Sequence, residues 1–394
     1  MQIKKWLALL LAAVMLITIL PGCGSDSSES DSSRSRRKHD TRSAGLYEPG
    51  TRERIKSWNE LVEEGIVMVI NGEVLSGWNE NTEENSSSEK LYGDLVLNKE
   101  VTSISSYAFA KCTRLTGITI PDSVTSIGEC AFYGCSSLTT ATIGDGVTSI
   151  GYRSFEKCTS LTSIEIPDSV IEIRNCAFCN CTSLTSVTLP DNITEIGNRT
   201  FGDCTSLTDI TIPDSVTAIY VDAFNGCTSL TGLNFPASLT FIGDHAFANC
   251  TSWEYTVYDN AKYLGDENNP YIYLFDTASD DITSCEIHAD TKFIDAYSFH
   301  GCRYLKSLDI PEGVVRIGSL AFKGCSSLTH ISFPDTLTRI GSYIFSDCYD
   351  LTNVTFAGTK AQWNAIIDAS EASLRGYRVP AKEVVCRDGS APLD

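Results

Sequence analysis

The sequence predicts a repeat solenoid with 23-residue turns, mostly β-structure with short helical turns on the convex side. A cysteine closes each turn, at positions 112, 135, 158, 181, 204, 227 and 250 and, after a longer gap, at 302, 325 and 348. A fixed period of this length indicates that one supersecondary unit stacks on its neighbours. A solenoid grows by adding turns, so the 394 residues do not require several globular cores.

Each turn contains two apolar segments that we expect to form opposite walls. In one representative turn, Ile164 and Ile166 are two residues apart, which places both side chains on one face of a strand. Pro167 cannot donate to a strand ladder and ends it. Ile173 lies on the returning wall, and Phe178 is expected to fill the layer from a short helical turn. Ten such turns are readable, with phenylalanine at 109, 132, 155, 178, 201, 224, 247, 299, 322 and 345.

The repeat divides the chain into segments with separate expected roles. Residues 44–90 form an N-terminal cap, 91–250 and 285–356 carry the repeats, 251–284 form an irregular aromatic-rich insertion, and 357–394 form a C-terminal cap. We expect the insertion to be a strand pair or bulging hairpin that replaces one turn. Because a solenoid exposes its core at both ends, small α+β caps are expected there.

Both caps have local signals of secondary structure. Residues 51–64 have helical spacing of apolar side chains, and Asn71-Gly72 between two apolar runs is typical of a β-hairpin turn. After residue 356, KAQWNAII predicts a short helix carrying Trp363 and Ile366, and EVVCRDG predicts a last strand.

The N-terminus is typical of an exported protein. Lys4 and Lys5 precede a fifteen-residue apolar run, Trp6–Leu20, which is short for a membrane span. Leu20-Pro21-Gly22-Cys23 resembles the lipobox of bacterial lipoproteins, which implies a signal peptide over 1–22 and a lipid on Cys23. Simple secretion is the alternative. Residues 23–43, rich in serine and arginine, predict a disordered tether.

Charge and motifs exclude several classes of function. The net charge is −20, from 50 acidic and 30 basic residues, whereas a nucleic-acid partner requires a basic face. The five histidines fall at unrelated repeat positions, and no hydrolase, zinc-protease or nucleotide-binding motif is present. We therefore expect no enzymatic activity, no catalytic residues and no cofactor.

Cysteine could form disulfides or bind metal, but the pattern favours a structural role. Ten of the sixteen cysteines occupy one repeat column, where a small apolar thiol suits a core position, so we expect free thiols. Cys176, Cys179 and Cys181 have a spacing that could suggest zinc, yet Cys181 belongs to the core column and no second cluster accompanies it. No metal site is predicted. The aspartates that follow the repeated prolines are expected to be turn residues, with calcium between layers as the alternative.

The tandem patterns I-P-D-S-V-T-x-I-G and A-F-x-x-C resemble the leucine-rich repeats of BspA-like bacterial surface proteins over about residues 91–356. The resemblance implies a leucine-rich-repeat type of solenoid, exposure at the cell surface, and binding to host or matrix proteins or to other cells.

Two groups of residues are candidates for binding. On the strand of each turn, outward positions carry a row of mainly threonine, at Thr119, Thr142, Glu165, Thr188 and Thr211. Such a row provides a flat docking surface or is ordinary β-propensity on a solvated face. The insertion gathers aromatic residues, namely Trp253, Tyr255, Tyr258, Tyr263, Tyr271 and Tyr273. These could form a ligand-binding protrusion or cover a break in the core.

These observations predict a lipid-anchored monomer on the extracellular face of a bacterial membrane that binds an extracellular protein non-covalently, as in adhesion. Its membrane contact would be through the lipid alone. The alternatives are a glycan- or mucin-binding module that uses the aromatics of residues 253–275, and a passive surface spacer without a ligand.

Overall fold

The computed structural model describes residues 67–70, 73–76, 78–79, 84–85, 91–370, 373–374, 376 and 379–393. The chain divides into two compact units, Met1–Ala44 and Gly45–Asp394, and all described residues belong to the second. The predicted signal peptide with Cys23, the tether and the helix over 51–64 lie outside the described residues. Within the described part, no helix is both long and apolar enough to cross a membrane.

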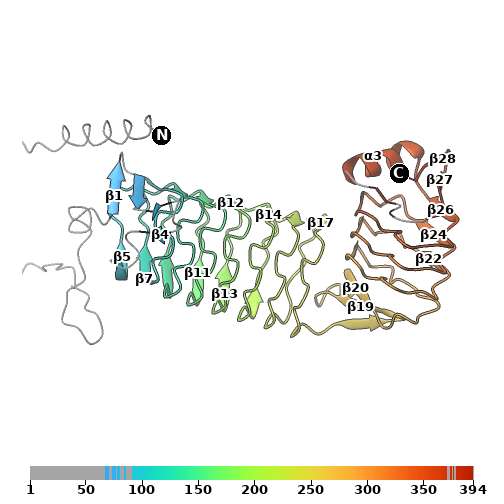
Figure 1. Cartoon of the computed structure of the whole chain (residues 1–394), viewed down its shortest axis with the longest axis horizontal. Helices are drawn as coiled ribbons and strands as arrows, with labels where there is room; N and C mark the ends of the chain where they lie inside the picture. The colour runs from blue at the N-terminus through green and yellow to red at the C-terminus, as the bar shows by residue number, and fades with distance from the viewer. Residues whose placement is uncertain are drawn as a thin grey trace, which may run out of the picture. The chain divides into compact units, whose positions relative to one another are not determined.

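Parallel strands at 23-residue intervals form one wall of the first stack (Figure 1). They are β5 (Tyr92–Val96), β7 (Arg114–Thr119), β9 (Thr140–Thr142), β11 (Ser163–Glu165), β13 (Ser186–Thr188) and β15 (Asp209–Ile210). Ile164 lies opposite Val187, one period further along the chain. Ile164 and Ile166 are both buried, so the predicted inward face is confirmed.

The returning wall consists of two-residue strands, also paired in parallel. These are β6 (Ser103–Ile104), β8 (Ser126–Ile127), β10 (Ser149–Ile150), β12 (Glu172–Ile173), β14 (Glu195–Ile196), β16 (Ala218–Ile219) and β17 (Phe241–Ile242). At its N-terminal end, β1 (Val67–Ile70) and β2 (Glu73–Ser76) pair antiparallel with Ile70 opposite Glu73, which confirms the predicted hairpin. Strand β2 continues the wall beside β6, and a separate pair, β3 (Trp78–Asn79) and β4 (Glu84–Asn85), lies in the same cap segment.

The segment around the repeated phenylalanine, which we call the arch, joins the two walls of each turn. In the arch of residues 130–134, the amides of Cys130, Phe132 and Gly134 donate to carbonyls of the next turn at 2.7–2.8 Å. Hydrogen bonds between residues three apart make the arch a series of tight turns instead of a regular helix. Two positions per arch have left-handed backbone, as at Arg153 (φ 55°) and Lys157 (φ 62°). We call the amide bonds between arches the arch ladder.

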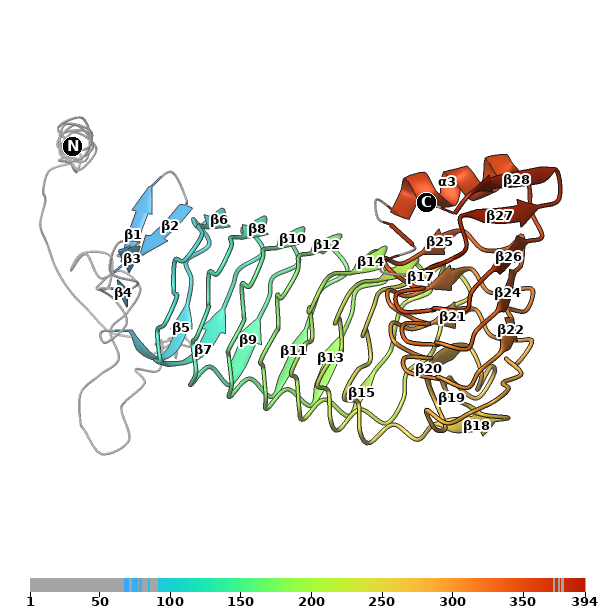
Figure 2. The ribbon, with the colours of Figure 1, turned by 45° about the vertical axis from the view of Figure 1, so that its right-hand side comes forward.

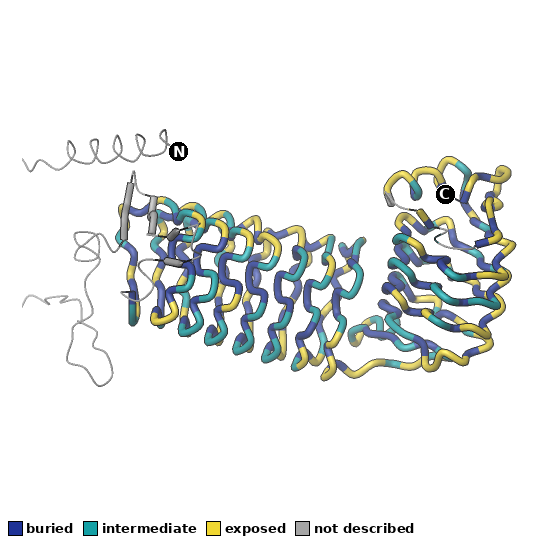
Figure 3. The backbone as a smooth tube through the Cα atoms, in the orientation of Figure 1, coloured by how far each residue is buried: buried dark blue, intermediate teal, exposed yellow. Residues whose placement is uncertain are grey.

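The core is built from stacked copies of the same side chains, and burial alternates along every turn (Figure 3). Phenylalanine rings from Phe109 to Phe247 stack with centroids 5.0–5.8 Å apart. The fifteen described cysteines are all free, which confirms the predicted thiol column. Eight of the ten column thiols also bridge layers, as where Cys181 Sγ donates to the Phe155 carbonyl at 3.2 Å. Burial raises the pKa of these thiols, to about 12 at Cys135.

The insertion interrupts the stack with an antiparallel meander. Strands β18 (Thr256–Tyr258), β19 (Ala261–Leu264) and β20 (Tyr273–Thr277) pair in order, and β20 then pairs parallel with β21 (Phe293–Ile294). The predicted strand pair therefore has a third strand, which takes the place of a turn. With the meander and the β1–β2 hairpin added to the ten readable repeats, the solenoid has about 12 turns.

The second stack repeats both walls and ends in the predicted cap (Figure 2). Its strands are β22 (Ser307–Asp309), β24 (His330–Phe333) and β26 (Asn353–Phe356) on one wall and β21, β23 (Arg316–Ile317) and β25 (Arg339–Ile340) on the other. Helix α3 (Lys360–Ser370) buries Trp363 and Ile366. Strands β27 (Glu383–Cys386) and β28 (Gly389–Pro392) extend the first of these walls, which confirms the predicted helix and strand.

Candidate binding sites

The outward residues of β7 to β15 form one candidate surface, which we call the strand face. Thr119, Thr142, Glu165, Thr188 and Thr211 are all exposed, one above the next at the 23-residue register. The row therefore exists as a continuous surface. Its role in binding stays a prediction.

A second column of threonines beside the strand face has a structural role. The hydroxyl of Thr139 donates to the Thr116 carbonyl at 2.9 Å, and that of Thr185 donates to the Thr162 carbonyl at 2.9 Å. In contrast, within the described residues no protein group holds the hydroxyls of Thr142 and Thr188. The strand-face hydroxyls are therefore available to a ligand, whereas those of the neighbouring column fasten one turn to the next.

A hollow of about 850 Å³ lies on the strand face over β9 and β11. It is lined by Thr142, Glu165 and Thr188 and by the turn residues Asp145 and Asp168. Two departures from the repeat in this turn account for it. Ala141 stands where other turns have isoleucine, and a Cβ on Gly144 would lie 2.5 Å from the Pro121 carbonyl carbon.

Residue 141 has a small side chain, and the Gly144 loop lies close to the preceding turn. Both leave space on the side of the following turn, toward residues 165–169. The three carboxylates at this hollow are exposed. Within the described part of the chain, no three His, Cys, Asp or Glu side chains converge in a way that could hold a metal ion.

The six aromatic residues predicted as a binding group do not share one surface. Trp253, Tyr263 and Tyr273 are buried, with Tyr263 and Tyr273 at most 1% exposed. Tyr258 and Tyr271 are partly buried around His288, whose ring stacks on Tyr271 at 3.7 Å between centroids.

Tyr255 alone among the six is exposed, at 52%. The insertion therefore presents no continuous aromatic platform. Most of these rings cover the place where the phenylalanine column is interrupted, as Tyr273 does by packing edge-on against Phe247.

Charged residues join the two stacks across the insertion, in a region that we call the seam (residues 251–296 and the turns beside them). Arg316 on β23 forms an ion pair with Asp244, 72 residues earlier, and its side chain is 8% exposed. The guanidinium also lies over the Phe241 ring at 4.9 Å. Burial raises the pKa of Asp244, but the charge of Arg316 and the hydrogen bonds from Ser319 and Arg316 together outweigh it, and the net direction is down.

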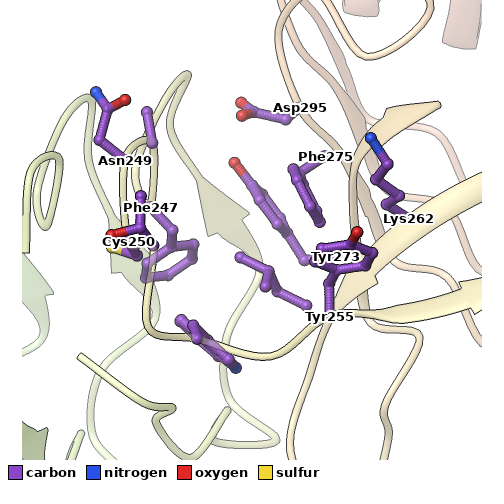
Figure 4. A pocket seen from close by; sticks show the side chains of 12 residues that line it. Phe247, Asn249, Cys250, Tyr255, Lys262, Tyr273, Phe275 and Asp295 are labelled. Atoms are coloured by element: carbon purple, nitrogen blue, oxygen red, sulfur yellow. The ribbon is translucent and has the colours of Figure 1, made fainter. Parts of the chain in front are cut away.

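A pocket of about 380 Å³ opens in the seam (Figure 4). Phe247 and Asn249 line it from the first stack, Trp253 from the start of the insertion, and Tyr273 and Phe275 from β20. At its margin, Asp295 accepts the His245 amide at 2.9 Å and the Ala296 amide at 2.7 Å. We call this cavity the seam pocket.

Sequence reasoning did not identify Asp244, Asp295, Arg316 or Phe247 as site residues. One signal could have found part of the seam. The position before the repeated isoleucine is serine, glutamate or alanine at 103, 126, 149, 172, 195 and 218, but becomes Phe241, Phe293, Arg316 and Arg339 in the turns around the insertion. A large or basic residue at a repeat position that is otherwise small or acidic indicates that the residues packed against it differ from those in the other turns.

The repeat, its register and the two walls define a leucine-rich-repeat solenoid. The family described as "BspA type Leucine rich repeat region" matches residues 85–170, 150–268 and 271–370, in six copies. The chain therefore belongs to this family, and the resemblance drawn from its repeat motifs is confirmed.

Similar solved structures are repeat proteins of bacteria. A leucine-rich cell surface protein from Faecalibacterium prausnitzii A2-165 is 34% identical, covering 68% of this chain and 86% of that one with a TM-score of 0.40. A leucine-rich-repeat protein of T. pallidum is 33% identical over 42% of this chain and 79% of its own, with a TM-score of 0.41. One from Bacteroides ovatus ATCC 8483 is 26% identical over 78% and 96%, with a TM-score of 0.39. No curated protein matches the chain.

Proposed function

We propose that this chain is a non-enzymatic binding protein displayed at the bacterial surface, and that it holds a protein ligand on its strand face. The hollow over β9 and β11 carries the proposal, because it combines free threonine hydroxyls with the exposed carboxylates of Asp145, Glu165 and Asp168. Hydroxyls accept and donate hydrogen bonds, and carboxylates only accept them. The hollow therefore suits a polypeptide segment that carries lysine or arginine.

Charge supports this choice of ligand. The chain has a net charge of −20, so a basic segment is attracted over a distance before it makes contact. Electrostatic attraction of this kind raises the association rate and weakens with salt. A ligand on the strand face should therefore bind more weakly as the salt concentration rises.

Surface display is part of the proposal and depends on the N-terminal segment. A signal peptide over 1–22 and a lipid on Cys23 would place the repeats outside the membrane, as family membership supports. Incorporation of labelled palmitate into the chain, lost in Cys23→Ser, is the expected result. Equal labelling of the unchanged protein and of Cys23→Ser would contradict a lipid anchor at Cys23.

The strand face is tested by charge reversal on one wall against the same change on the other. Glu165→Lys alters the hollow, whereas Glu172→Lys alters an exposed glutamate of the same turn on the returning wall. The full chain is assayed by surface plasmon resonance against fibronectin, laminin, collagen and mucin. We expect saturable binding to at least one protein, weakened about tenfold or more by Glu165→Lys and unchanged by Glu172→Lys.

Equal loss in the two variants would show a non-specific charge effect and contradict the proposal. Absence of saturable binding to every probe would contradict it as well and favour a passive spacer. Binding to mucin that survives Glu165→Lys but is lost in Tyr255→Ala would favour the glycan alternative, since Tyr255 is the exposed aromatic of the insertion.

A further inference from the structure

The arch ladder is interrupted at the seam pocket. In the preceding turn, the amides of Asp222, Phe224 and Gly226 donate to carbonyls of the following arch at 2.8–3.1 Å. At the seam, His245 donates to the Asp295 carboxylate instead, at 2.9 Å. Across the described part of the chain, the next two amides of this arch, those of Phe247 and Asn249, have no acceptor.

In the other arches these amides donate to the following turn, and here the seam pocket, lined by both residues, stands on that side. Phe247 is 3% exposed, so its amide is removed from bulk water, whereas Asn249 is exposed. A buried donor without an acceptor is unfavourable. A ligand that offers two acceptors at the spacing of alternate residues would pair with both amides and satisfy the buried donor at Phe247.

The polar side chains around the pocket are mostly already paired. Lys262 Nζ is 2.7 Å from Asp276 Oδ2, the Asn249 side-chain amide donates to Asn225 at 3.0 Å, and Asp295 accepts two backbone amides. Two hydroxyls of the lining are not held by a hydrogen bond of normal geometry among the described residues: that of Tyr255, which is exposed, and that of Tyr273, whose residue is 1% exposed and whose oxygen faces the Asp295 carboxylate (Figure 4). Burial, with Asp295 nearby, raises the pKa of Tyr273, so the hydroxyl remains a donor.

The free groups are thus donors, two of them from the backbone, and the rest of the lining is largely apolar. A saccharide requires several unpaired polar side chains inside the site to hold its hydroxyls, and within the seam pocket only the Tyr273 hydroxyl is both buried and unpaired. An extended polypeptide requires backbone donors for its carbonyls and an apolar place for a side chain, as in binding by strand addition. We propose that the seam pocket binds an extended polypeptide segment of a partner protein, which pairs with the Phe247 and Asn249 amides and inserts one apolar side chain between Phe247, Trp253 and Phe275.

This site is distinct from the strand face, and the repeat itself supplies a variant that fills it. Ala248 lines the pocket, and its equivalent in an earlier turn is Tyr133, so the arch accepts a tyrosine at this position. Ala248→Tyr is therefore expected to occupy the pocket without unfolding the turn. The control is Lys323→Tyr, which introduces a tyrosine at the same repeat position in the second stack, away from the pocket.

The experiment screens displayed random linear peptides against the full chain and measures the enriched peptides by isothermal titration calorimetry. We expect enrichment of peptides with a large apolar residue, and binding weakened about tenfold or more by Ala248→Tyr but unchanged by Lys323→Tyr and by Glu165→Lys. Tyr273→Phe should weaken binding about twofold to tenfold, as for loss of one hydrogen bond. Circular dichroism melts of each variant check that the fold is kept.

The backbone contacts have a separate readout. Replacing a peptide amide by an ester weakens that carbonyl as an acceptor, so two positions spaced two residues apart should each lose about twofold to tenfold in affinity. The proposal is overturned if no peptide is enriched, if Ala248→Tyr and Lys323→Tyr act alike, or if the ester scan shows no dependence on position. It is also overturned if a glycan panel, and no peptide, gives binding that Ala248→Tyr removes. None of these results would alter the strand-face proposal, whose test uses Glu165.

Discussion

The first stack, residues 91–250, and the seam solve the same packing problem in opposite ways. In the stack, every layer presents the same side chains, so phenylalanine packs on phenylalanine and each thiol meets the same carbonyl of the layer before it. In the seam, each contact occurs once, as between Arg316 and Asp244 or between Asp295 and the His245 amide. Repetition gives a closed ladder, and its interruption leaves groups free to meet a ligand.

The two regions should also respond differently to perturbation. A solenoid is stabilised by contacts between nearest neighbours, so a change within the stack is shared by adjacent identical layers. The contacts of the seam occur once, so a change there is not compensated by identical neighbouring contacts. Three changes test whether the stack and the seam respond differently.

Alkaline pH should have the largest effect, and it should act on the stack first. Burial raises the pKa of the seven column thiols from Cys112 to Cys250 above the ordinary value of 9.0, to about 12 at Cys135 and Cys250. The unfolded chain therefore loses these protons first. The stability that the protonated thiols contribute is complete below pH 9 and falls as pH rises from about 9 toward about 12.

Within that window each thiol lowers the free energy of unfolding by about 1.4 kcal/mol per pH unit, so the seven together lower it by about 10 kcal/mol per pH unit. Urea unfolding followed by circular dichroism between pH 7 and pH 10.5 measures the effect. Cys181→Val removes one ionisable group and should reduce the pH slope by about the share of one thiol. A midpoint that does not change from pH 8 to pH 10.5 would contradict the prediction.

Truncation of one ring in the stack should be next in size. Phe178 is fully buried between Phe155 and Phe201, with centroids 5.5 and 5.6 Å away, and Phe178→Ala should destabilise by about 3–5 kcal/mol. Phe275 provides the comparison in the seam, because its ring is only partly buried. Phe275→Ala should cost about half as much or less. Similar losses for the two variants in urea unfolding would remove the distinction between the regions.

Loss of the seam ion pair should be smaller and should separate the two stacks. Asp244→Ala leaves the Arg316 guanidinium, 8% exposed, without its carboxylate, and about 3 kcal/mol is expected, the low end for a buried pair because Asp244 itself is 19% exposed. Hydrogen exchange should show faster opening of β20 and β21 while β11 and β13 stay protected.

The control is a pair on the surface of the stack. Glu172 and Arg174 are 48% and 61% exposed, so Glu172→Ala should change stability by less than about 0.5 kcal/mol. Uniform loss of protection along the whole chain in Asp244→Ala would show that the seam is not a separate unit.

The stack was predictable from the sequence because residues separated by one period occupy the same column. Phe178 and Cys181 recur at 23-residue intervals, and parallel pairing at that register puts the copies in contact. The hairpin before the repeats and the helix carrying Trp363 were predictable for a different reason, since local turn chemistry and helical spacing act over a few residues.

The seam was not predictable in the same way. Asp244 and Arg316 are 72 residues apart, which is not a multiple of the period, and their contact depends on how the β18–β20 meander fills a layer. Two roles were open for the aromatics of residues 253–275, a binding protrusion or a cover over a break in the core, and the burial of Tyr263 and Tyr273 fits the second. Composition shows that rings are present but not which face of a meander they occupy.

The hollow on the strand face lies between these cases. The departures from the repeat at Ala141 and Gly144 can be seen in the sequence. The position of the hollow cannot be predicted from these departures, since it depends on the Gly144 loop approaching Pro121 more closely than a residue with a Cβ could. A departure from a repeat therefore locates a candidate site without giving its shape.

The arch ladder has one more consequence, for the length of such chains. Every arch of the first stack before the seam donates its amides toward the turn that follows and offers its carbonyls to the turn before, so each layer has donors on one face and acceptors on the other. A whole 23-residue unit can therefore be duplicated or deleted without leaving either new edge mismatched. The number of turns is free to vary during evolution, whereas the seam, whose contacts belong to particular residues on both sides, can be moved only as one piece.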